Sequence, residues 1–408
     1  MRKFLDEKVS TANIDILLLI PIAVLLMIGG LALYSTAHGA PFVGTSLMRQ
    51  MVWLSLGLVL VWTLRWIDPR MYYLHAYRLY ILLLLLLLLT YFMPMIAGGR
   101  RWLFIGPMRL QPSELGKIVI VFALAKYLTD YRKHLDEFFY AVAPLGIAAI
   151  PAMLIIGQPD LGTALIIIMV TFSMMYWAGI SLFYLFVIIA PLLSIVTGFG
   201  FYAFSFWMAI LMVVLYRAKI RLRWKTTVFV LNAMFGTLAP FLWNSLQPYQ
   251  QQRILTVIDA SADPHGAGYQ VLQSRTAIGS GGLFGKGLGQ GTQTQLRFLP
   301  VTDTDFIIAV IGEEFGFIAI LLILIMFVWL LLRLIDRAST TQYRFASLSV
   351  VGFAGIFMVH IFVNMGMSTG LMPVTGLPLP FLSYGGSFLL TCILMIGLTQ
   401  HLLAGEPL

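Results

Sequence analysis

Charged residues are scarce in this chain of 408 residues. Only 11% are charged and 60% are hydrophobic, whereas soluble domains carry about 25% charged and about 45–50% apolar residues. This imbalance excludes a soluble globular protein and indicates a polytopic membrane protein. The net charge of +9 would suggest nucleic-acid binding in a soluble protein. In a membrane protein, basic cytoplasmic loops and contact with anionic lipid explain it, so no nucleic-acid partner is expected.

Cysteine is almost absent, and His/Cys clusters are missing. The single cysteine, Cys392, lies in an apolar run, so no intramolecular disulfide can form. Without a His/Cys pattern of metal-ligand spacing, we predict neither a metal site nor a cofactor. Soluble domains, repeats and long linkers are also missing, so residues 1–408 read as one integral membrane domain.

Apolar runs recur along the chain, each long enough for a helix of about 20 residues that spans the hydrocarbon core. We predict an all-α fold with about twelve spans, at residues 14–34, 49–66, 79–97, 114–128, 139–157, 161–178, 181–198, 201–216, 226–246, 305–332, 345–365 and 385–403. The first run is longer than the usual apolar region of a signal peptide, so an uncleaved span is favoured over a cleaved signal peptide. Residues 199–246 read as a transmembrane hairpin with almost no membrane-embedded charge, and we assign it no chemistry.

Lysine and arginine fall in alternate loops, which predicts the orientation because cytoplasmic loops carry an excess of both. They precede the first span and follow the second, fourth, eighth and tenth: Arg2, Lys3, Lys8, Arg65, Arg70, Arg78, Lys126, Arg132, Lys133, Arg217, Lys219, Arg221, Arg223, Lys225, Arg333, Arg337 and Arg344. Both termini are then cytoplasmic, and residues 247–304 form a large extracytoplasmic loop.

One outer loop, residues 98–113, breaks this rule because it holds Arg100, Arg101 and Arg109. Positive charge placed against the topological bias suggests that the loop holds an anion. Contact with lipid phosphates at the interface is the simpler alternative.

Ionisable residues follow at the next predicted helix starts. Glu114 and Lys117 share a helix face at spacing i, i+3. They form either a simple ion pair or a pair that faces a substrate path. Asp160 can cap the sixth span, and capping alone could explain its presence.

The loop 247–304 is too long for a simple connector and too rich in apolar anchors for disorder. Its seven glycines between Gly279 and Gly291 allow tight turns and close approach to a ligand. The spacing around Lys286 is not that of a nucleotide-binding phosphate loop. Exposed amides with Lys286 and Arg275 are nevertheless suited to a pyrophosphate. A glycine-rich lid without ligand contact is the alternative.

Asp305 lies where this loop enters the tenth span. Thr304 or Asp303 can cap that helix and leave Asp305 in its first turn, although capping could also be the role of Asp305 itself. A half-buried position is expected to raise the pKa of Asp305, which suits a general base. Glu313 and Glu314 lie deeper and are expected to bond neighbouring helices or basic groups.

The last outer loop, Leu371–Ser387, contains three prolines that preclude a regular helix. Irregular backbone at membrane depth must line a cavity or be surrounded by protein. Ser383, Tyr384 and Ser387 supply hydroxyl groups to that lining.

Several of these stretches resemble motifs of the SEDS family of bacterial peptidoglycan polymerases. The matching segments, which cover nearly the whole chain in order, are Gly99–Trp102, Gln111–Lys117, Gln158–Thr163, Ala267–Gly291, Phe306–Gly316 and Leu379–Ser387. The run AIGSGGLFGKGLGQGTQTQL is more similar to the elongation member, RodA, than to the division member, FtsW.

The resemblance implies a glycosyltransferase that polymerises lipid II on the outer face of the bacterial plasma membrane during cell elongation and shape maintenance. It implies that Asp305, in the T-D-F motif, is essential, and it matches Trp102, Glu114 and Lys117 to functional positions of the family. The implied partners are a class B penicillin-binding protein transpeptidase, other elongation-complex proteins and lipid II itself.

Two features depart from the family pattern. Val301 and Asp303 stand where the family usually has Glu and His, so the roles of those side chains do not carry over, or Asp303 substitutes for the acid. The family usually has ten spans, so the hairpin 199–246 reads as an inserted pair. An even insertion keeps the loop 247–304 outside.

Our mechanistic hypothesis is that Asp305 accepts the proton of the GlcNAc 4-hydroxyl as that oxygen attacks C1 of MurNAc. Undecaprenyl pyrophosphate leaves, and the configuration inverts. Residues expected to bind the substrate are Trp102, Arg101, Arg109, Glu114, Lys117, Asp160, Arg275, Lys286 and Ser383. No nucleotide is needed, because the lipid substrate is already activated. A divalent ion that bridges Asp305 and the pyrophosphate is an alternative.

Two other functions fit the same sequence. A transporter that flips lipid II would also use multiple spans, a proline-broken segment and an intramembrane ion pair. A non-catalytic scaffold that activates the transpeptidase is the third interpretation. Only the enzyme requires Asp305 for glycan synthesis.

Overall fold

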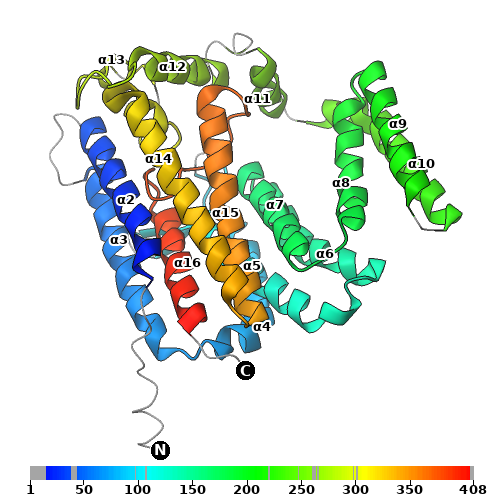
Figure 1. Cartoon of the computed structure of the whole chain (residues 1–408). Coiled ribbons are helices and arrows are strands. Elements are labelled where there is room, and N and C mark those ends of the chain that lie inside the picture. The colour runs from blue at the N-terminus through cyan, green and yellow to red at the C-terminus, as the bar shows by residue number, and fades with distance from the viewer. Residues whose placement is uncertain are drawn as a thin grey trace, which may run out of the picture.

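In the computed structural model, the chain folds into a bundle of helices (Figure 1). The described residues are 15–37, 44–96, 98–105, 108–218, 221–246, 248–259, 263, 266–296, 298–299 and 302–404. Met1–Lys8, Lys219 and Val301, which entered the sequence predictions, lie outside these ranges.

The elements of the first half are α2 (Ile16–Thr36), α3 (Ser46–Thr63), η1 (Leu64–Trp66), α4 (Arg70–Thr90), β1 (Leu103–Ile105), β2 (Met108–Leu110), α5 (Pro112–Asp130), η2 (Arg132–His134), α6 (Phe138–Gly157), α7 (Leu161–Trp177) and α8 (Leu182–Thr197). Those of the second half are α9 (Phe201–Arg217), α10 (Leu222–Ser245), α11 (Pro248–Ile258), α12 (Ala267–Ser280), α13 (Thr292–Gln295), α14 (Ile307–Thr340), α15 (Arg344–Thr369) and α16 (Gly386–Ala404).

Each predicted span overlaps a helix, from α2 to α10 and from α14 to α16. Eight of the described helices are long and apolar enough to cross a membrane, and α7, α8 and α9 are shorter apolar helices. The all-α, multi-pass membrane class is therefore confirmed. The count of twelve crossings stays a prediction.

The central helix of the bundle is α15, of whose apolar segment 83% is buried. It packs against α5, α7, α12, α14 and α16. Close packing depends on small residues: a Cβ on Gly352 would lie 2.6 Å from Val121 Cγ1 of α5 and 3.0 Å from Met174 Sδ of α7. Glycine at this point lets both helices approach the α15 backbone.

Helices α8, α9 and α10 stand apart from this bundle (Figure 1). They share a small apolar core of their own around Trp207 and Leu211. Within it, Ser194 Oγ donates to Asn232 Oδ1 (2.7 Å) and accepts a hydrogen bond from Trp207 Nε1 (2.9 Å). The hairpin predicted at 199–246 corresponds to α9 and α10, and its origin as an insertion remains a prediction.

The predicted limits of the third span are wrong. We expected residues 79–97, but α4 runs from Arg70 to Thr90. Its start is set by Asp68, whose Oδ1 accepts a hydrogen bond from the Arg70 amide (2.9 Å). Arg70 and Arg78, which were assigned to the preceding loop, thus belong to α4, whereas Arg65 lies in η1. Pro94 disfavours helix in the residues before it.

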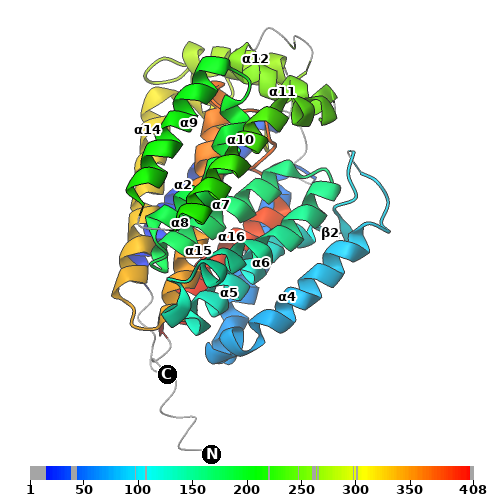
Figure 2. The same cartoon turned by 90° about the vertical axis from the view of Figure 1, so that its right-hand side faces the viewer.

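The predicted outer loop 247–304 contains the helices α11, α12 and α13. Figure 2 shows α11 and α12 lying across one end of the bundle, opposite to the end where α2 begins and α16 finishes. The expectation of an ordered loop is confirmed for its described residues. The loop 98–113 forms an antiparallel hairpin in which Phe104 of β1 faces Arg109 of β2.

Candidate active site

Asp305 lies in the turn 302–305, directly before α14. Its Oδ1 atom accepts a hydrogen bond from Thr304 Oγ1 (2.9 Å). Its backbone carbonyl accepts one from Asn364 Nδ2 of α15 (2.9 Å). The central helix therefore fixes the backbone of Asp305, while the carboxylate remains half-buried.

The predicted capping of α14 is wrong. The helix begins at Ile307, and the preceding Phe306 makes no side-chain capping bond, so Asp305 lies before the first turn. The carboxylate of Asp303 instead accepts a hydrogen bond from Ser46 Oγ at the start of α3. The carbonyl of Asp303 accepts another from the Tyr384 amide (2.8 Å). Aspartate is a common capping residue, but Asp303 makes contacts across the bundle instead of capping α14.

The environment of Asp305 changes its acidity. Burial raises its pKa above the usual value of an aspartate, and the Thr304 hydroxyl and the charge of Arg253 partly oppose this shift. A carboxylate with a raised pKa accepts a proton more readily, as a general base requires. Arg253, the one cation of α11, was not among the predicted site residues.

The last outer loop forms a wall of the Asp305 site. Gly376 adopts a φ of 73°, and a Cβ added there would lie 3.5 Å from Asp305 Oδ2. Glycine thus permits the turn and leaves space beside the carboxylate. The next residue, Leu377, packs against Gly162 at the start of α7. Gly376 is exposed, whereas residues 379–383 are buried, so this later part of the loop is surrounded by protein, which is one of the two predicted alternatives.

Two polar residues one turn apart on α15 hold this loop. Asn364 Nδ2 donates to the Leu377 carbonyl (2.7 Å), as well as to that of Asp305. His360 Nδ1 lies 3.0 Å from the Pro378 carbonyl. Both side chains are completely buried. Sequence reasoning missed them, although two polar residues at spacing i, i+4 in an apolar run are a signal for a buried polar face.

A third clamp on the loop comes from α3. Gln50 Nε2 donates to the Ser383 carbonyl (3.1 Å). The hydroxyl of Ser383 is buried and accepts a hydrogen bond from the Leu379 amide (2.9 Å). In this structure Ser383 stabilises the loop, and a contact of Ser383 with substrate stays a prediction.

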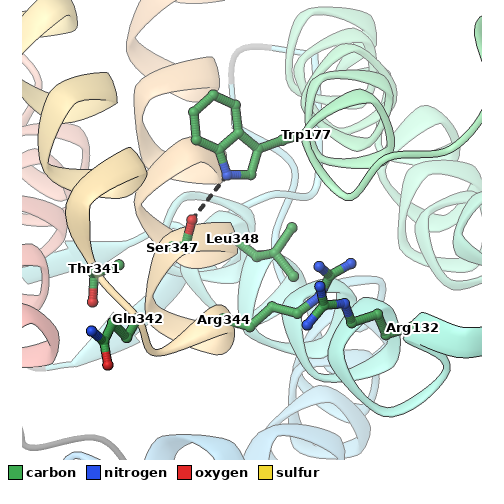
Figure 3. A pocket seen from close by; sticks show the side chains of 7 residues that line it. All are labelled: Arg132, Trp177, Thr341, Gln342, Arg344, Ser347 and Leu348. Atoms are coloured by element: carbon green, nitrogen blue, oxygen red, sulfur yellow. Dashed lines mark hydrogen bonds between the residues drawn. The ribbon is translucent and has the colours of Figure 1, made fainter.

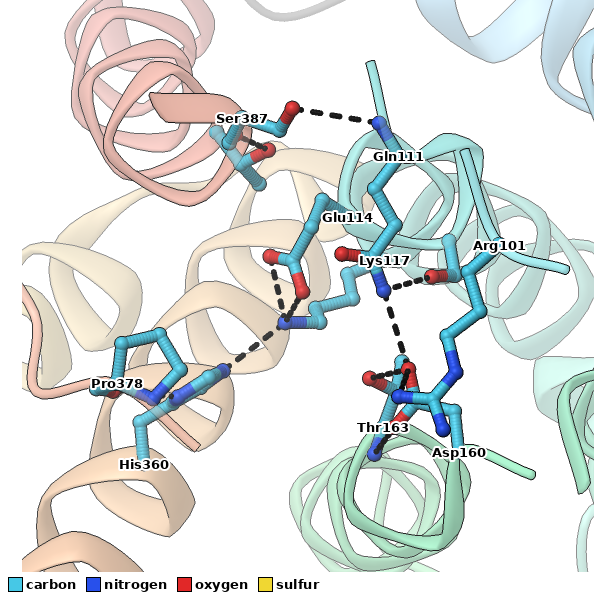
Figure 4. A network of polar contacts seen from close by, with 11 residues as sticks. Arg101, Gln111, Glu114, Lys117, Asp160, Thr163, His360, Pro378 and Ser387 are labelled. Carbon is cyan, nitrogen blue, oxygen red and sulfur yellow. Dashed lines mark hydrogen bonds and ion pairs between the residues drawn. The ribbon is translucent and has the colours of Figure 1, made fainter. Parts of the chain in front are cut away.

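Glu114 and Lys117 form the predicted ion pair on the other side of the loop (Figure 4). Lys117 Nζ donates to both carboxylate oxygens of Glu114 (3.0 and 2.9 Å) and lies 3.0 Å from His360 Nε2. The ammonium group has three protons, so Nε2 is the acceptor. The ring proton is therefore on Nδ1, where it donates to the Pro378 carbonyl. Lys117 is only 2% exposed, so the pair is buried and saturated.

Asp160 caps α7, as predicted. Its Oδ1 accepts a hydrogen bond from the Thr163 amide (3.2 Å), and its Oδ2 accepts one from Gln111 Nε2 (3.1 Å). Arg101 reaches the same connection, where its Nε donates to the Gln158 carbonyl (2.7 Å). Figure 4 shows this second cluster beside the Glu114–Lys117 pair. Arg101 and Asp160 thus tie the outer hairpin to the start of α7.

The other predicted substrate contacts lie nearer the surface. Trp102 is half-buried directly before β1, and Arg109 on β2 is exposed. Arg275 is exposed on α12 and lies beside Gly370, where an added Cβ would be 3.6 Å from Arg275 Cδ. Arg109 and Arg275 are therefore accessible to an anionic ligand.

Lys286 lies in the glycine-rich segment, which clasps a kink in α14. The kink is at Gly316, with φ of 76° and ψ of −171°. The amides of Lys286 and Gly287 donate to the carbonyls of Glu313 and Glu314 just before it (both 2.9 Å). Lys286 Nζ also donates to Glu313 Oε1 (2.8 Å), which confirms a basic partner for that carboxylate. These contacts favour the structural lid over a pyrophosphate cradle, and substrate binding by Lys286 stays a prediction.

Across the described ranges, no three His, Cys, Asp or Glu side chains gather in a group that could hold a metal ion. The chemistry that the geometry offers directly is proton transfer to a carboxylate.

Comparison with known proteins gives matches along nearly the whole chain. The sequence matches the FtsW/RodA/SpoVE family, described as cell cycle protein, over residues 11–209 and 203–405. It is 33% identical over 360 residues to the peptidoglycan glycosyltransferase MrdB of Escherichia coli (strain K12), covering 87% of this chain and 84% of that protein. It is 29% identical to the peptidoglycan glycosyltransferase RodA of Treponema pallidum (strain Nichols), covering 97% and 99%.

Solved structures share the fold. A chain from work on a peptidoglycan synthase complex that coordinates polymerization and crosslinking superposes with a TM-score of 0.72 at 28% identity, covering 96% of this chain and 98% of that one. The rod shape determining protein RodA of Thermus thermophilus superposes with a TM-score of 0.61 at 27% identity, covering 96% and 97%.

Proposed function

The chain belongs to the FtsW/RodA/SpoVE family, and from this membership we propose that it is a peptidoglycan glycosyltransferase of the RodA type, with Asp305 as its catalytic base. Its relatives in Escherichia coli and Treponema pallidum are named for that activity. The substrate in this proposal is lipid II, which the enzyme polymerises into glycan strands during cell elongation.

Asp305 removes the proton from the 4-hydroxyl of GlcNAc on one lipid II as that oxygen attacks C1 of MurNAc on the other. The bond from C1 to undecaprenyl pyrophosphate breaks, and the anomeric centre inverts from α to β. The observation that carries this role is a half-buried carboxylate with a raised pKa, bonded through Oδ1 and facing Gly376 through Oδ2. A placed base contributes about 10²–10⁴-fold to such a reaction.

The leaving pyrophosphate develops negative charge, which cations on the same outer side of the protein stabilise in this proposal. Arg253 acts electrostatically on the Asp305 carboxylate, and the exposed Arg109 and Arg275 are accessible to an anion. We therefore assign the pyrophosphate to these three arginines. Arg101 is already bonded to the Gln158 carbonyl, so in this proposal it supports the site from behind.

We refer to the buried, fully hydrogen-bonded group of Glu114, Lys117 and His360 as the saturated cluster, and we propose that it positions Asp305. The Glu114–Lys117 pair reaches the Pro378 carbonyl through His360. One turn along α15, Asn364 bonds the carbonyls of Leu377 and Asp305. We propose that these four side chains hold the last loop and Asp305 in register, instead of contacting lipid II directly. A misplaced reacting group costs rate even where substrate still binds.

Partner and orientation follow from separate observations. The distribution of lysine and arginine supports cytoplasmic termini and an extracytoplasmic Asp305. The likeness to a chain from a peptidoglycan synthase complex supports a partner that crosslinks the strands, a class B penicillin-binding protein transpeptidase. The remaining members of the elongation complex stay a prediction.

The test is polymerisation of lipid II by the purified full-length protein in detergent, with its transpeptidase present. Asp305→Ala is expected to make no glycan strands. Asp303→Asn is the matched control, because it removes a carboxylate two residues away that bonds Ser46, and it is expected to make strands. Wild-type strand lengths from Asp305→Ala would sink the catalytic assignment. A wild type that moves lipid II across vesicles but forms no strands would favour the transporter instead.

A further inference from the structure

A second polar site lies at the opposite end of α14 from Asp305. A pocket of about 200 Å³ opens there between η2, the end of α7 and the connection from α14 to α15 (Figure 3). Its lining includes Arg132, Trp177, Gln342, Arg344 and Ser347. Three segments that are distant in the sequence thus meet at one pocket, and the proposed reaction uses none of these residues.

The pocket gathers positive charge. Figure 3 shows the guanidinium groups of Arg132 and Arg344 close together, and the charge of Arg132 acts on Arg344. No carboxylate belongs to the lining in the part of the chain that the structure describes. Arg344 is partly buried and Arg132 is exposed beside it, so the repulsion between the two charges is relieved when an anion binds between them.

The donors of Arg344 are only partly used. Its Nη2 donates to the Ala178 carbonyl at the end of α7 (2.9 Å). Its Nε is buried and has no hydrogen-bond partner among the described residues. A buried donor without a partner costs free energy, and a rotation of the guanidinium group that turns Nε towards a ligand oxygen in the pocket would recover that cost.

The neutral residues of the pocket fix its shape. Trp177 Nε1 donates to Ser347 Oγ (2.9 Å), which in turn donates to the Ala338 carbonyl near the end of α14 (2.7 Å). This chain of hydrogen bonds ties α7, α14 and α15 together beside the two arginines. The cations therefore face a pocket with a fixed wall.

We propose that this pocket binds a phosphate group. Guanidinium groups present planar pairs of donors that match phosphate oxygens, and Arg is preferred over Lys where such geometry counts. The phosphate belongs either to the headgroup of an anionic lipid at the membrane boundary or to a free phosphate ion. Bound there, it would link η2 to the turn between α14 and α15, at the far end of the helix that follows Asp305.

The test uses the full-length protein in detergent with three probes: dimyristoyl phosphatidylglycerol, dimyristoyl phosphatidylcholine and inorganic phosphate. Native mass spectrometry measures lipid binding, and the melting temperature measures stabilisation by phosphate. Arg132→Gln is the main variant, because Arg132 is exposed and its loss does not threaten the fold. Lys133→Gln is the matched control, since this exposed cation is the neighbouring residue and does not line the pocket.

Arg132→Gln is expected to weaken binding about tenfold, which corresponds to about 1.4 kcal/mol. Arg132→Gln combined with Arg344→Gln is expected to abolish it, and Lys133→Gln to leave it unchanged. Loss confined to phosphatidylglycerol identifies a lipid headgroup, whereas loss confined to inorganic phosphate identifies a free ion. Equal binding of phosphatidylglycerol and phosphatidylcholine excludes the anionic lipid headgroup and leaves the free ion. Equal weakening by Lys133→Gln, or undiminished binding of every probe by the double variant, overturns the proposal.

Discussion

The two polar clusters that flank the last outer loop use the same kinds of residue in opposite ways. On one side, Lys117 is buried and its three ammonium protons are directed to Glu114 and His360. On the other side, the Asp305 carboxylate is half-buried and bonds Thr304 through one oxygen. A saturated cluster holds backbone in place, whereas a carboxylate with an accessible oxygen can take up a proton.

The comparison separates the effect of burial from the effect of pairing. Removing one partner of a buried ion pair leaves a charge that protein cannot solvate, at a cost of about 3–5 kcal/mol. Neutralising an unpaired, partly buried carboxylate has no such cost, because burial already favours its neutral form. Substitutions in the two clusters should therefore divide into those that affect stability and those that affect rate.

The largest expected effect is on rate, from Asp305→Asn. Polymerisation of lipid II should fall by about 10²–10⁴-fold, because the amide cannot accept the proton. The melting temperature should stay the same or rise, because the amide carries no charge that burial penalises. Strand synthesis and thermal unfolding measured on the same preparation check both. A large drop in melting temperature would make Asp305 a structural residue and remove the contrast.

The next effect is on stability, from Lys117→Met. This variant should lose about 3–5 kcal/mol of stability, because it leaves Glu114 buried without its cation. The double variant Glu114→Gln, Lys117→Met should recover most of that loss, as thermal unfolding of the three proteins would show. The double variant still lacks the contact from Lys117 to His360, so if that contact positions the loop, kcat stays low while KM is unchanged. A stable double variant with a raised KM would mean that Lys117 contacts the substrate.

Asn364→Leu tests the connection between the two clusters. The substitution removes the donor to the carbonyls of Asp305 and Leu377 while it preserves bulk on α15. A displaced base should lower kcat by about 10²-fold with little change in KM. Ser349→Ala is the control, because its buried hydroxyl bonds only within α15, to the Phe345 carbonyl. Equal losses in both variants would indicate general damage to the helix.

The sequence could predict the features that depend on nearby residues, but not those that depend on residues far away in the chain. The helices at the predicted spans, the Glu114–Lys117 pair and the Asp160 cap depend on neighbours within a few residues, and all three are present in the structure. The start of α14 was wrong because the carboxylate of Asp303 bonds Ser46, far away in the sequence. The preference of aspartate for helix starts cannot predict a hydrogen-bond partner that is so distant in the sequence.

The clamps on the last loop were missed for a related reason. Gln50, His360 and Asn364 act on backbone carbonyls, which every residue carries and no sequence pattern marks. The glycine-rich segment was open to two interpretations because close approach suits a ligand as well as another backbone. In the structure the approaching backbone is that of α14, just before Gly316.

The smallest expected effect is a shift in pH dependence, from Arg253→Gln. The charge of Arg253 lowers the pKa of Asp305 against the larger, opposite effect of burial, so its removal raises that pKa further. A general base works in its ionised form, so the rate falls as the pH falls through this pKa. The acid limb of the kcat profile should therefore move to higher pH in the variant.

Arg275→Gln sharpens this prediction, because it removes another cation of the outer loop that is exposed on α12. If Arg275 binds only the pyrophosphate, the rate falls at every pH and the acid limb stays where it is in the wild type. If the acid limb of the kcat profile also stays in place in Arg253→Gln, Arg253 acts on the substrate and not on the pKa of Asp305. If the acid limb moves in Arg253→Gln but not in Arg275→Gln, the group that titrates is a carboxylate close to Arg253, as Asp305 is, and not Glu114.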